Sequence, residues 1–362
     1  VIKVNKDRTV QKNKLNPIFF WEKIINDHQA FFLYDRTNSP FAPTQHKSAV
    51  ILDKVESSLK FLEKKKPFAI FFPSTPHIFD TWVFARVAEL MGTKILYFQQ
   101  SIFPWRYFLI SGLQKMPTAV RVKGIKKPNK ISIERDYINS KKKHASEAEP
   151  MYTKIRLSKN KGKYYNIFSD IKSYWKRPDL IINKYLCFRR YKALSKKDLP
   201  EKFILLFLHY QPERTTLPDG FGFTQQLAAV KALQLALPDG VKLFVKEHPS
   251  LFLRQCHWKV RNPEWYNKIL SDKTELADIN IDAYTLIDKS IAVASVAGTT
   301  VGESLLRGKP GIIFGTGPLY YSECEKLHKY TTVKSLSLFL QDSLKSKSPF
   351  DLNESIMNDA VD

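Results

Sequence analysis

Apolar runs and amphipathic stretches alternate through the first hundred residues. Ala30–Tyr34, Phe68–Phe72 and Lys94–Phe98 are short, mainly apolar runs that we predict to be strands. Between them, residues 48–65 and 79–91 carry apolar side chains at helical spacing. Strands that alternate with helices in this way predict right-handed βαβ units and a parallel sheet.

The second half of the chain repeats this alternation more clearly, with predicted strands at Phe203–Leu208, Val241–Val245, Ile291–Ser295 and Gly311–Phe314. We therefore expect an α/β fold of two Rossmann-like, doubly wound domains that face each other across a cleft. The N-terminal domain covers residues 1–197 and the C-terminal domain residues 198–334. Residues 335–362 are expected to form a C-terminal helix and tail that packs back on the N-terminal domain.

Composition narrows the class of protein. The 362 residues are 43% hydrophobic and 13% aromatic, which is enough for a large core and excludes a mainly disordered chain. The sequence contains no run of 18 uncharged apolar residues, so no transmembrane helix is predicted. The three cysteines (Cys187, Cys256 and Cys324) are widely spaced, which argues against a disulfide framework or a zinc ribbon. We expect a protein of the reducing cytoplasm.

Positive charge is concentrated in a basic insertion of the N-terminal domain, at about residues 115–197. Between Lys115 and Pro200 there are 24 basic and 7 acidic residues, which is +17 of the chain's net +23. A solvated surface explains this charge, and so does attraction to anionic lipid headgroups. No nucleic-acid-binding motif accompanies the charge, so a nucleic-acid partner is not expected. An anionic membrane surface is therefore a candidate partner of the basic insertion.

The first candidate site is the polar loop after the predicted strand Phe203–Leu208. It carries two carboxylates, Glu213 and Asp219, together with Gln211 and Arg214. A carboxylate held on such a loop can act as a base or as a nucleophile. A capped surface turn is the structural alternative.

The second and third candidate sites also follow predicted strands. Lys246-Glu-His-Pro249 places a histidine where it can hydrogen-bond a phosphate or carry a proton. Ser295-Val-Ala-Gly-Thr-Thr-Val-Gly-Glu303 ends on a predicted helix, where Gly298 lets a ligand approach the backbone and free N–H groups favour an anion. A structural histidine and a capped helix are the alternatives. No His, Cys and Asp cluster has metal-site spacing, so no metal or other cofactor is expected.

In their order and spacing, the segments LHYQPERTT…PDG, LFVKEHPS and VAGTTVGESLLRGKPGIIFG resemble bacterial capsule and O-antigen polysaccharide glycosyltransferases of the GT-B fold. Within that group they look most similar to the retaining enzymes that transfer 3-deoxy-D-manno-oct-2-ulosonic acid (Kdo) from CMP-Kdo. The resemblance covers about residues 204–315, and the N-terminal half matches only in architecture. It implies a glycan or lipid-linked glycan acceptor and a role in assembling surface polysaccharide, such as lipopolysaccharide O-antigen or capsule. Together with the basic insertion, it also implies a cytoplasmic protein that is peripheral on the anionic inner face of the bacterial inner membrane.

The resemblance also implies roles for individual residues. His248 and Pro249 match a His-Pro motif that holds the nucleotide, with the imidazole near the phosphate and the proline at the base pocket. The residues expected in the rest of the nucleotide-sugar site are Gln211, Arg214, Lys246, Arg254, Ser295, Gly298, Thr299, Thr300 and Glu303. Among them, Lys246 and Arg254 would balance the donor's negative charge, and Glu303 would contact the ribose.

In the Kdo enzymes that the sequence resembles, a loop carboxylate attacks the anomeric carbon and forms a covalent sugar–enzyme intermediate. We expect Asp219 to play this part, because it is flanked by Gly220, with Glu213 as the other candidate. Retention requires a second group that deprotonates the acceptor, and Glu147 and Glu149 are its candidates. The alternatives are another donor (a UDP- or GDP-sugar), a polyol-phosphate transferase of the teichoic-acid type, and a non-enzymatic lipid- or polysaccharide-binding protein.

Overall fold

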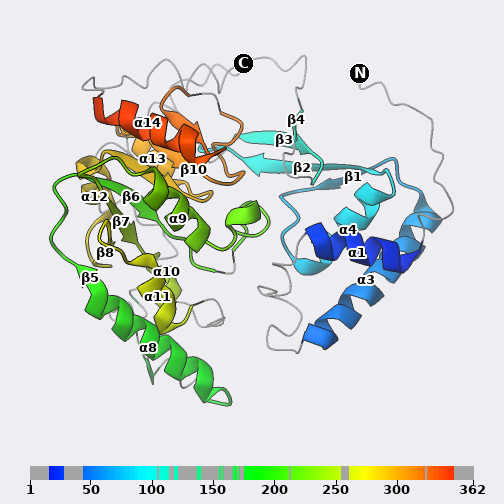
Figure 1. Ribbon diagram of the computed structural model, residues 1–362. Coiled ribbons are helices and arrows are strands. Elements are labelled where there is room, and N and C mark those ends of the chain that lie inside the picture. The colour runs from blue at the N-terminus through cyan, green and yellow to red at the C-terminus, as the bar shows by residue number, and fades with distance from the viewer. Residues whose placement is uncertain are drawn as a thin grey trace. The chain divides into compact units, whose positions relative to one another are not determined.

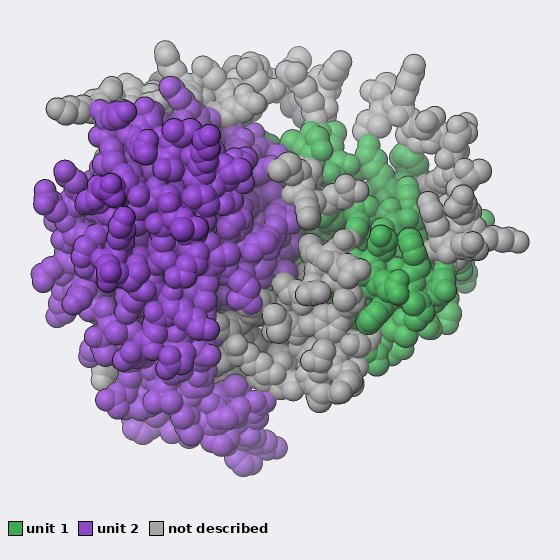
Figure 2. Space-filling view, in the orientation of Figure 1, with its two compact units in different colours: residues 1–101, 105–123 green, residues 102–104, 124–362 purple. Residues whose placement is uncertain are grey.

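The computed structural model describes residues 16–27, 44–103, 106–113, 118–120, 137–139, 175–211, 213–253, 261–322 and 324–345, and a few single positions between 155 and 171. The chain divides into two compact units, which Figure 2 colours separately. Unit 1 comprises residues 1–101 and 105–123, and unit 2 comprises residues 102–104 and 124–362.

Unit 1 combines helices with a mixed sheet of strand order β1-β2-β3-β4. β1 and β2 are parallel and are joined through α4, as predicted, whereas β3 and β4 are antiparallel. β3 follows β2 after a connection too short for a crossover helix, so a hairpin is the geometry available to it. The predicted strand Ala30–Tyr34 lies outside the described residues. The described elements are α1 (Pro17–Asp27), α3 (Thr44–Lys65), β1 (Ala69–Phe72), α4 (Phe79–Leu90), β2 (Lys94–Gln100), β3 (Tyr107–Ser111) and β4 (Thr118–Ala119).

Unit 2 contains a sheet in which every pair of neighbouring strands is parallel. Its strand order in the described residues is β11-β10-β9-β6-β7-β8-β5 (Figure 1). Four of these strands, β6, β7, β9 and β10, coincide with the four strands predicted for this half. The strands are β5 (Ser195–Lys196), β6 (Phe203–Phe207), β7 (Lys242–Lys246), β8 (Thr274–Ala277), β9 (Ala292–Ser295), β10 (Gly311–Ile313) and β11 (Leu327–Lys329).

Helices cover the sheet of unit 2. All five residues of β6 are buried, as expected of a central strand that is covered on both faces. Phe203, Leu205 and Phe207 belong to one core cluster with residues of α12 and α13, and the alternation of a strand turns Ile204 and Leu206 to the opposite face. The α/β class predicted from the sequence is confirmed, and the cleft between two domains stays a prediction. The described helices are α8 (Pro178–Leu194), α9 (Leu227–Ala236), α10 (Ser250–Leu253), α11 (Pro263–Ile269), α12 (Ala283–Lys289), α13 (Thr300–Leu306), α14 (Val333–Lys345) and the 3₁₀ helix η3 (Phe221–Phe223).

The boundary between the compact units falls near residue 123, earlier than the predicted boundary after residue 197. The difference is due to α8, which the charge pattern assigns to the basic insertion but whose buried side chains pack within unit 2. Tyr191 is fully buried, and its hydroxyl donates to the carbonyl of Ala277 in β8 at 2.5 Å. Tertiary packing, which the local pattern does not contain, decides this assignment.

The C-terminal helix also belongs to unit 2. α14 packs against α9 and buries Leu336 and Leu340, and its packing on the N-terminal domain stays a prediction. Residues 346–362 lie outside the described residues. Within the described part of the chain, none of the helices is both long and apolar enough to cross a membrane.

Candidate active site at the carboxyl edge of the unit 2 sheet

The strand order of unit 2 contains a topological switch point between β6 and β9. From β6 the chain goes outward to β7 and β8, and it then returns to the other side of β6 to form β9, β10 and β11. Doubly wound sheets bind ligands outside the carboxyl ends of their strands at such a point. The loops after β6, β7 and β9 carry the three predicted motifs, so the fold gathers these motifs at one edge.

His209 connects the first motif to the third. Its Nε2 lies 3.0 Å from Oγ of Ser295 and accepts the backbone N–H of Ala297 at 3.3 Å. Because Nε2 accepts, the neutral form of the ring carries its proton on Nδ1, which lies 3.1 Å from Oγ1 of Thr215. The Thr215 hydroxyl in turn donates to Oε2 of Glu213 at 2.7 Å. A continuous hydrogen-bond chain therefore runs from the loop after β9 to a carboxylate on the loop after β6.

Two glycines allow the loops to approach one another. A Cβ at Gly298 would lie 2.7 Å from Oγ of Ser295 and 3.0 Å from Cε1 of His209, which is closer than real Cβ atoms pack. A Cβ at Gly315, after β10, would lie 2.2 Å from the carbonyl oxygen of Asp219. The backbone oxygen leaves no room for a side chain at Gly315, and a side chain at Gly298 would displace those of Ser295 and His209.

Arg261 connects the first motif to the second. This buried guanidinium donates to Oε1 of Gln211 at 2.9 Å, to the carbonyl of His209 at 3.3 Å and to Oε2 of Glu247 at 3.2 Å. It also lies 3.7 Å from the centre of the Trp265 ring. A planar fork of donors suits such a site, because one side chain fixes two loops and a carboxylate at once.

His248 is oriented by its neighbours. Its backbone N–H donates to Oε1 of Glu247 at 3.0 Å, and its Nδ1 accepts the N–H of Ser250 at 3.0 Å. The ring meets Tyr210 edge-on, with centroids 4.9 Å apart. Since Nδ1 accepts, the neutral ring carries its proton on Nε2. Pro249 follows at the start of α10 and is half-buried.

The two carboxylates of the first motif occupy different environments. Burial raises the pKa of Glu213, but the hydrogen bond and charge of His209, the Thr215 hydroxyl and the charge of His248 outweigh burial and lower that pKa to about 2. Burial raises the pKa of Asp219 to about 7, despite the opposing charge of Arg214, and the charge of Glu213 adds to the rise. Carboxyl groups with separated pKa values are typical of acid–base pairs.

Accessibility also separates these carboxylates. The side chain of Glu213 is 24% exposed, whereas Asp219 is 3% exposed. Oδ2 of Asp219 accepts no hydrogen bond, and Nε of Arg214 lies 3.5 Å from it. The more accessible carboxylate is therefore that of Glu213, and which of the two acts as the nucleophile stays a prediction.

Two side chains that were expected to contact the ligand form hydrogen bonds within unit 2. The ammonium of Lys246 donates to the carbonyls of Asp278, Ile279 and Ile281 at 3.2, 2.9 and 2.6 Å, so it holds the loop after β8 in place of the expected contact with the donor. The amide of Gln211 accepts from Arg261 and donates to the carbonyl of Thr224 at 2.7 Å. Its amide is therefore part of the framework that supports the loop.

The remaining predicted residues are placed only in part. Thr299 and Thr300 begin α13, where Oγ1 of Thr300 is buried without a hydrogen-bond partner, and Glu303 is half-buried on the same helix. Arg254, Glu147 and Glu149 lie outside the described residues. No group of three or more His, Cys, Asp or Glu in the described part of the chain could hold a metal ion.

Sequence reasoning missed three residues that organise this edge, namely His209, Glu247 and Arg261. A signal existed for the first two, because each is a polar residue within two positions of the buried end of a strand, β6 or β7. Arg261 had no such signal, since its partners are 14 to 52 residues away in sequence.

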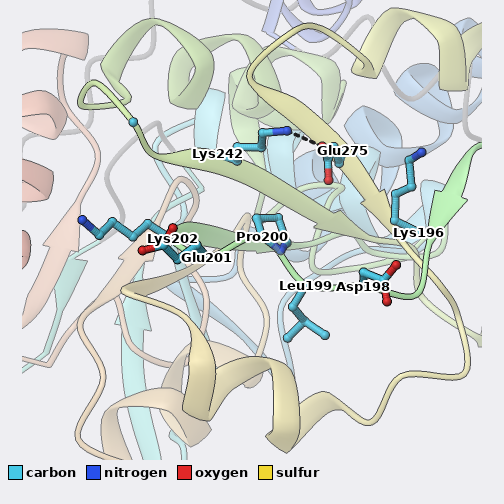
Figure 3. Close-up of a pocket in the computed structure, with 9 residues that line it drawn as sticks. Lys196, Asp198, Leu199, Pro200, Glu201, Lys202, Lys242 and Glu275 are labelled. Atoms are coloured by element: carbon cyan, nitrogen blue, oxygen red, sulfur yellow. Dashed lines mark hydrogen bonds and ion pairs between the residues drawn. The ribbon is translucent and has the colours of Figure 1, made fainter.

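The cavity found in unit 2 lies at the opposite, amino edge of the sheet. It has a volume of about 440 Å³ and is lined by residues that precede β6 and β7, together with Lys196 of β5 and Glu275 of β8 (Figure 3). Lys242 and Glu275 form an ion pair there. The predicted motif residues do not line this cavity.

No protein-family model and no curated protein matches the chain. Among solved structures, the chain is similar to the Thermosulfurimonas dismutans KpsC beta Kdo 2,7 transferase, at 11% identity over 78% of each chain with a TM-score of 0.35. It is also similar to the beta Kdo 2,4 transferase of the same KpsC, at 14% identity over 75% of this chain and 77% of that chain with a TM-score of 0.29. A third similar structure is the Methanocaldococcus jannaschii UDP-GlcNAc 2-epimerase in complex with UDP-GlcNAc and UDP, at 12% identity, 86% and 80% coverage and a TM-score of 0.30. Similarity at this level does not bear on reaction or substrate.

Proposed function

We propose that the protein is a glycosyltransferase of surface polysaccharide assembly that transfers Kdo from CMP-Kdo to a glycan or lipid-linked glycan, with retention of configuration. The observation that carries the proposal is the meeting of three motif loops at the switch point of unit 2, joined by His209 and Arg261. The choice of CMP-Kdo as the donor rests on the resemblance of the same motifs to Kdo transferases.

The nucleotide is assigned to the loops after β7 and β9. The Nε2 proton of His248 suits a hydrogen bond to the phosphate of the cytidine monophosphate, because Nδ1 already accepts from the backbone. The turn at Gly298 lets the donor approach the backbone closely. A positively polarised donor near the departing phosphate stabilises the charge that develops on it.

We assign the nucleophile to Glu213. Its carboxylate attacks the anomeric carbon, the bond from that carbon to the phosphate oxygen breaks, and CMP leaves with the electron pair. The acceptor hydroxyl then attacks the same carbon, loses its proton to a base and releases the carboxylate. Two inversions at one carbon give net retention, as in retaining glycosidases.

Asp219 has a supporting part in this scheme. Because burial keeps its carboxyl protonated up to about pH 7, Glu213 carries the negative charge of the loop alone below that pH. Glu147 and Glu149 stay the proposed bases for the acceptor hydroxyl. A cytoplasmic location at the inner membrane remains part of the proposal, since acceptors of this kind are lipid-linked.

Calorimetric titration of the full chain with CMP, UDP and CDP-glycerol tests the donor class. The proposal expects CMP to bind and the other two to bind at least tenfold more weakly. Preference for UDP would reassign the donor to a UDP-sugar, and preference for CDP-glycerol would reassign the reaction to polyol-phosphate transfer. Binding of none would favour a non-enzymatic role.

A further inference from the structure

α8 is apolar on two faces, and among the described residues its inner face is buried whereas its outer face is largely exposed. Its inner face buries Leu180, Ile181, Cys187 and Tyr191, and α8 packs on α11 and β8 of unit 2 (Figure 1). A soluble helix normally pairs one apolar stripe with a polar opposite face. The second apolar face of α8 therefore calls for an explanation.

The outer face is a continuous stripe. Ile182, Tyr185 and Leu186 are 57%, 38% and 44% exposed, and they stand at positions i, i+3 and i+4 of the helix. Arg189 follows at i+7 on the same side and is exposed. Residues with this spacing lie above one another on a helix surface. We call Ile182, Tyr185, Leu186 and Arg189 the α8 stripe.

Positive charge surrounds the stripe. Asp179 is the only acidic residue of α8, and Arg177 pairs with both of its carboxylate oxygens, at 2.9 and 2.7 Å. The other basic residues near the two ends of the stripe are Lys176, Arg190 and Lys192. Trp175, just before the helix, is 69% exposed. The surface is thus apolar along its centre and cationic at its ends.

We propose that the α8 stripe docks on the surface of an anionic lipid bilayer. Apolar side chains of a helix that lies in the membrane plane enter the region below the headgroups, while Lys and Arg contact the lipid phosphates. Trp and Tyr favour this interface because they combine an apolar ring with a polar group. A protein partner would need acidic groups next to an apolar groove. An anionic bilayer offers negatively charged phosphates and an apolar interior to any helix that lies on its surface. This inference does not depend on the proposed sugar transfer.

Co-sedimentation of the full chain with vesicles tests the proposal. The vesicles are phosphatidylcholine with one quarter phosphatidylglycerol, and phosphatidylcholine alone. The variants are Ile182→Ser combined with Leu186→Ser, and separately Arg189→Glu. The matched control combines Leu235→Ser on α9 with Leu338→Ser on α14, which are 74% and 58% exposed and lie on other helices of unit 2.

The proposal expects the wild-type chain to bind anionic vesicles at least tenfold more tightly than neutral ones, with binding that weakens as salt rises. Each α8 variant should lose about tenfold or more of this binding, and the control should lose none. Thermal unfolding midpoints should match the wild type, because the substituted side chains are exposed. Equal binding by wild type and α8 variants would overturn the proposal. So would a change in oligomeric state of the lipid-free double variant, which would assign the stripe to a second copy of the chain.

Discussion

The two edges of the unit 2 sheet differ in how far their polar side chains are buried and hydrogen-bonded. At the carboxyl edge, His209, Glu247 and Arg261 are buried and each is held by several hydrogen bonds. At the amino edge, lysines and carboxylates line an open cavity, and the Lys242–Glu275 ion pair is part-exposed.

This difference indicates that the buried polar network, and not the cavity, marks the candidate active site of unit 2. Burying a charged or polar group costs free energy unless partners satisfy it, so a buried network implies a gain that offsets the cost. An exposed ion pair contributes little and implies nothing about function. Each prediction below therefore pairs a change at the carboxyl edge with a chemically matched change at the amino edge.

The largest effect is expected for Glu213→Gln. The amide is not a nucleophile, so sugar transfer should fall by at least about 10⁴-fold, as when other catalytic nucleophiles are removed. Affinity for CMP, measured by calorimetry, should stay within about threefold. The matched Glu275→Gln variant should transfer sugar at the wild-type rate. Transfer by Glu213→Gln at a comparable rate would reject the assignment of Glu213.

Arg261→Met tests the buried clamp. Loss of the guanidinium leaves the Glu247 carboxylate buried without its ion-pair partner, which typically costs about 3–5 kcal/mol. The free energy of unfolding from urea titration should fall by this amount. Lys242→Met, which breaks an exposed pair, should cost less than about 1 kcal/mol. Equal losses in the free energy of unfolding for Arg261→Met and Lys242→Met would contradict the proposed difference between the two edges.

Asp219→Asn tests the raised pKa. Folding raises the pKa of Asp219 from 3.8 to about 7, so its neutral form stabilises the fold fully below about pH 4, and this contribution is lost as pH rises through 7. Asparagine stays neutral throughout. The variant should therefore be more stable than the wild type at pH 8, by at most about 4 kcal/mol, and equal to it below pH 4. A difference that does not change with pH, or one shared by Asp198→Asn, would contradict this reading.

The smallest effect is expected for His248→Ala. Loss of a charge-assisted hydrogen bond to the phosphate should weaken CMP binding by about 1–3 kcal/mol. Calorimetry on this variant measures it, with Lys202→Ala at the amino edge as the control that should bind normally. Unchanged affinity for CMP would place the phosphate elsewhere.

The sequence predicted the parts of this edge that are local. The apolar runs located β6, β7, β9 and β10, and because parallel strands share a carboxyl edge, their loops could be expected to meet. The contacts between loops could not be predicted, since Arg261 meets His209 across 52 residues. The preference for Asp219 rested on its neighbouring glycine, and it ignored the burial that keeps this carboxyl protonated. The assignment of α8 to unit 2 likewise depends on tertiary packing.

The central claim is that Glu213 forms a covalent bond to the donor sugar. Trypsin cleaves after Arg214, so it separates Glu213, in the peptide 203–214, from Asp219, in the peptide 215–231. After incubation of the full chain with CMP-Kdo and no acceptor, mass spectrometry should find one added Kdo residue on the peptide 203–214. Kdo on the peptide 215–231, or no adduct on a protein that transfers Kdo to an added acceptor and releases CMP, would contradict the account.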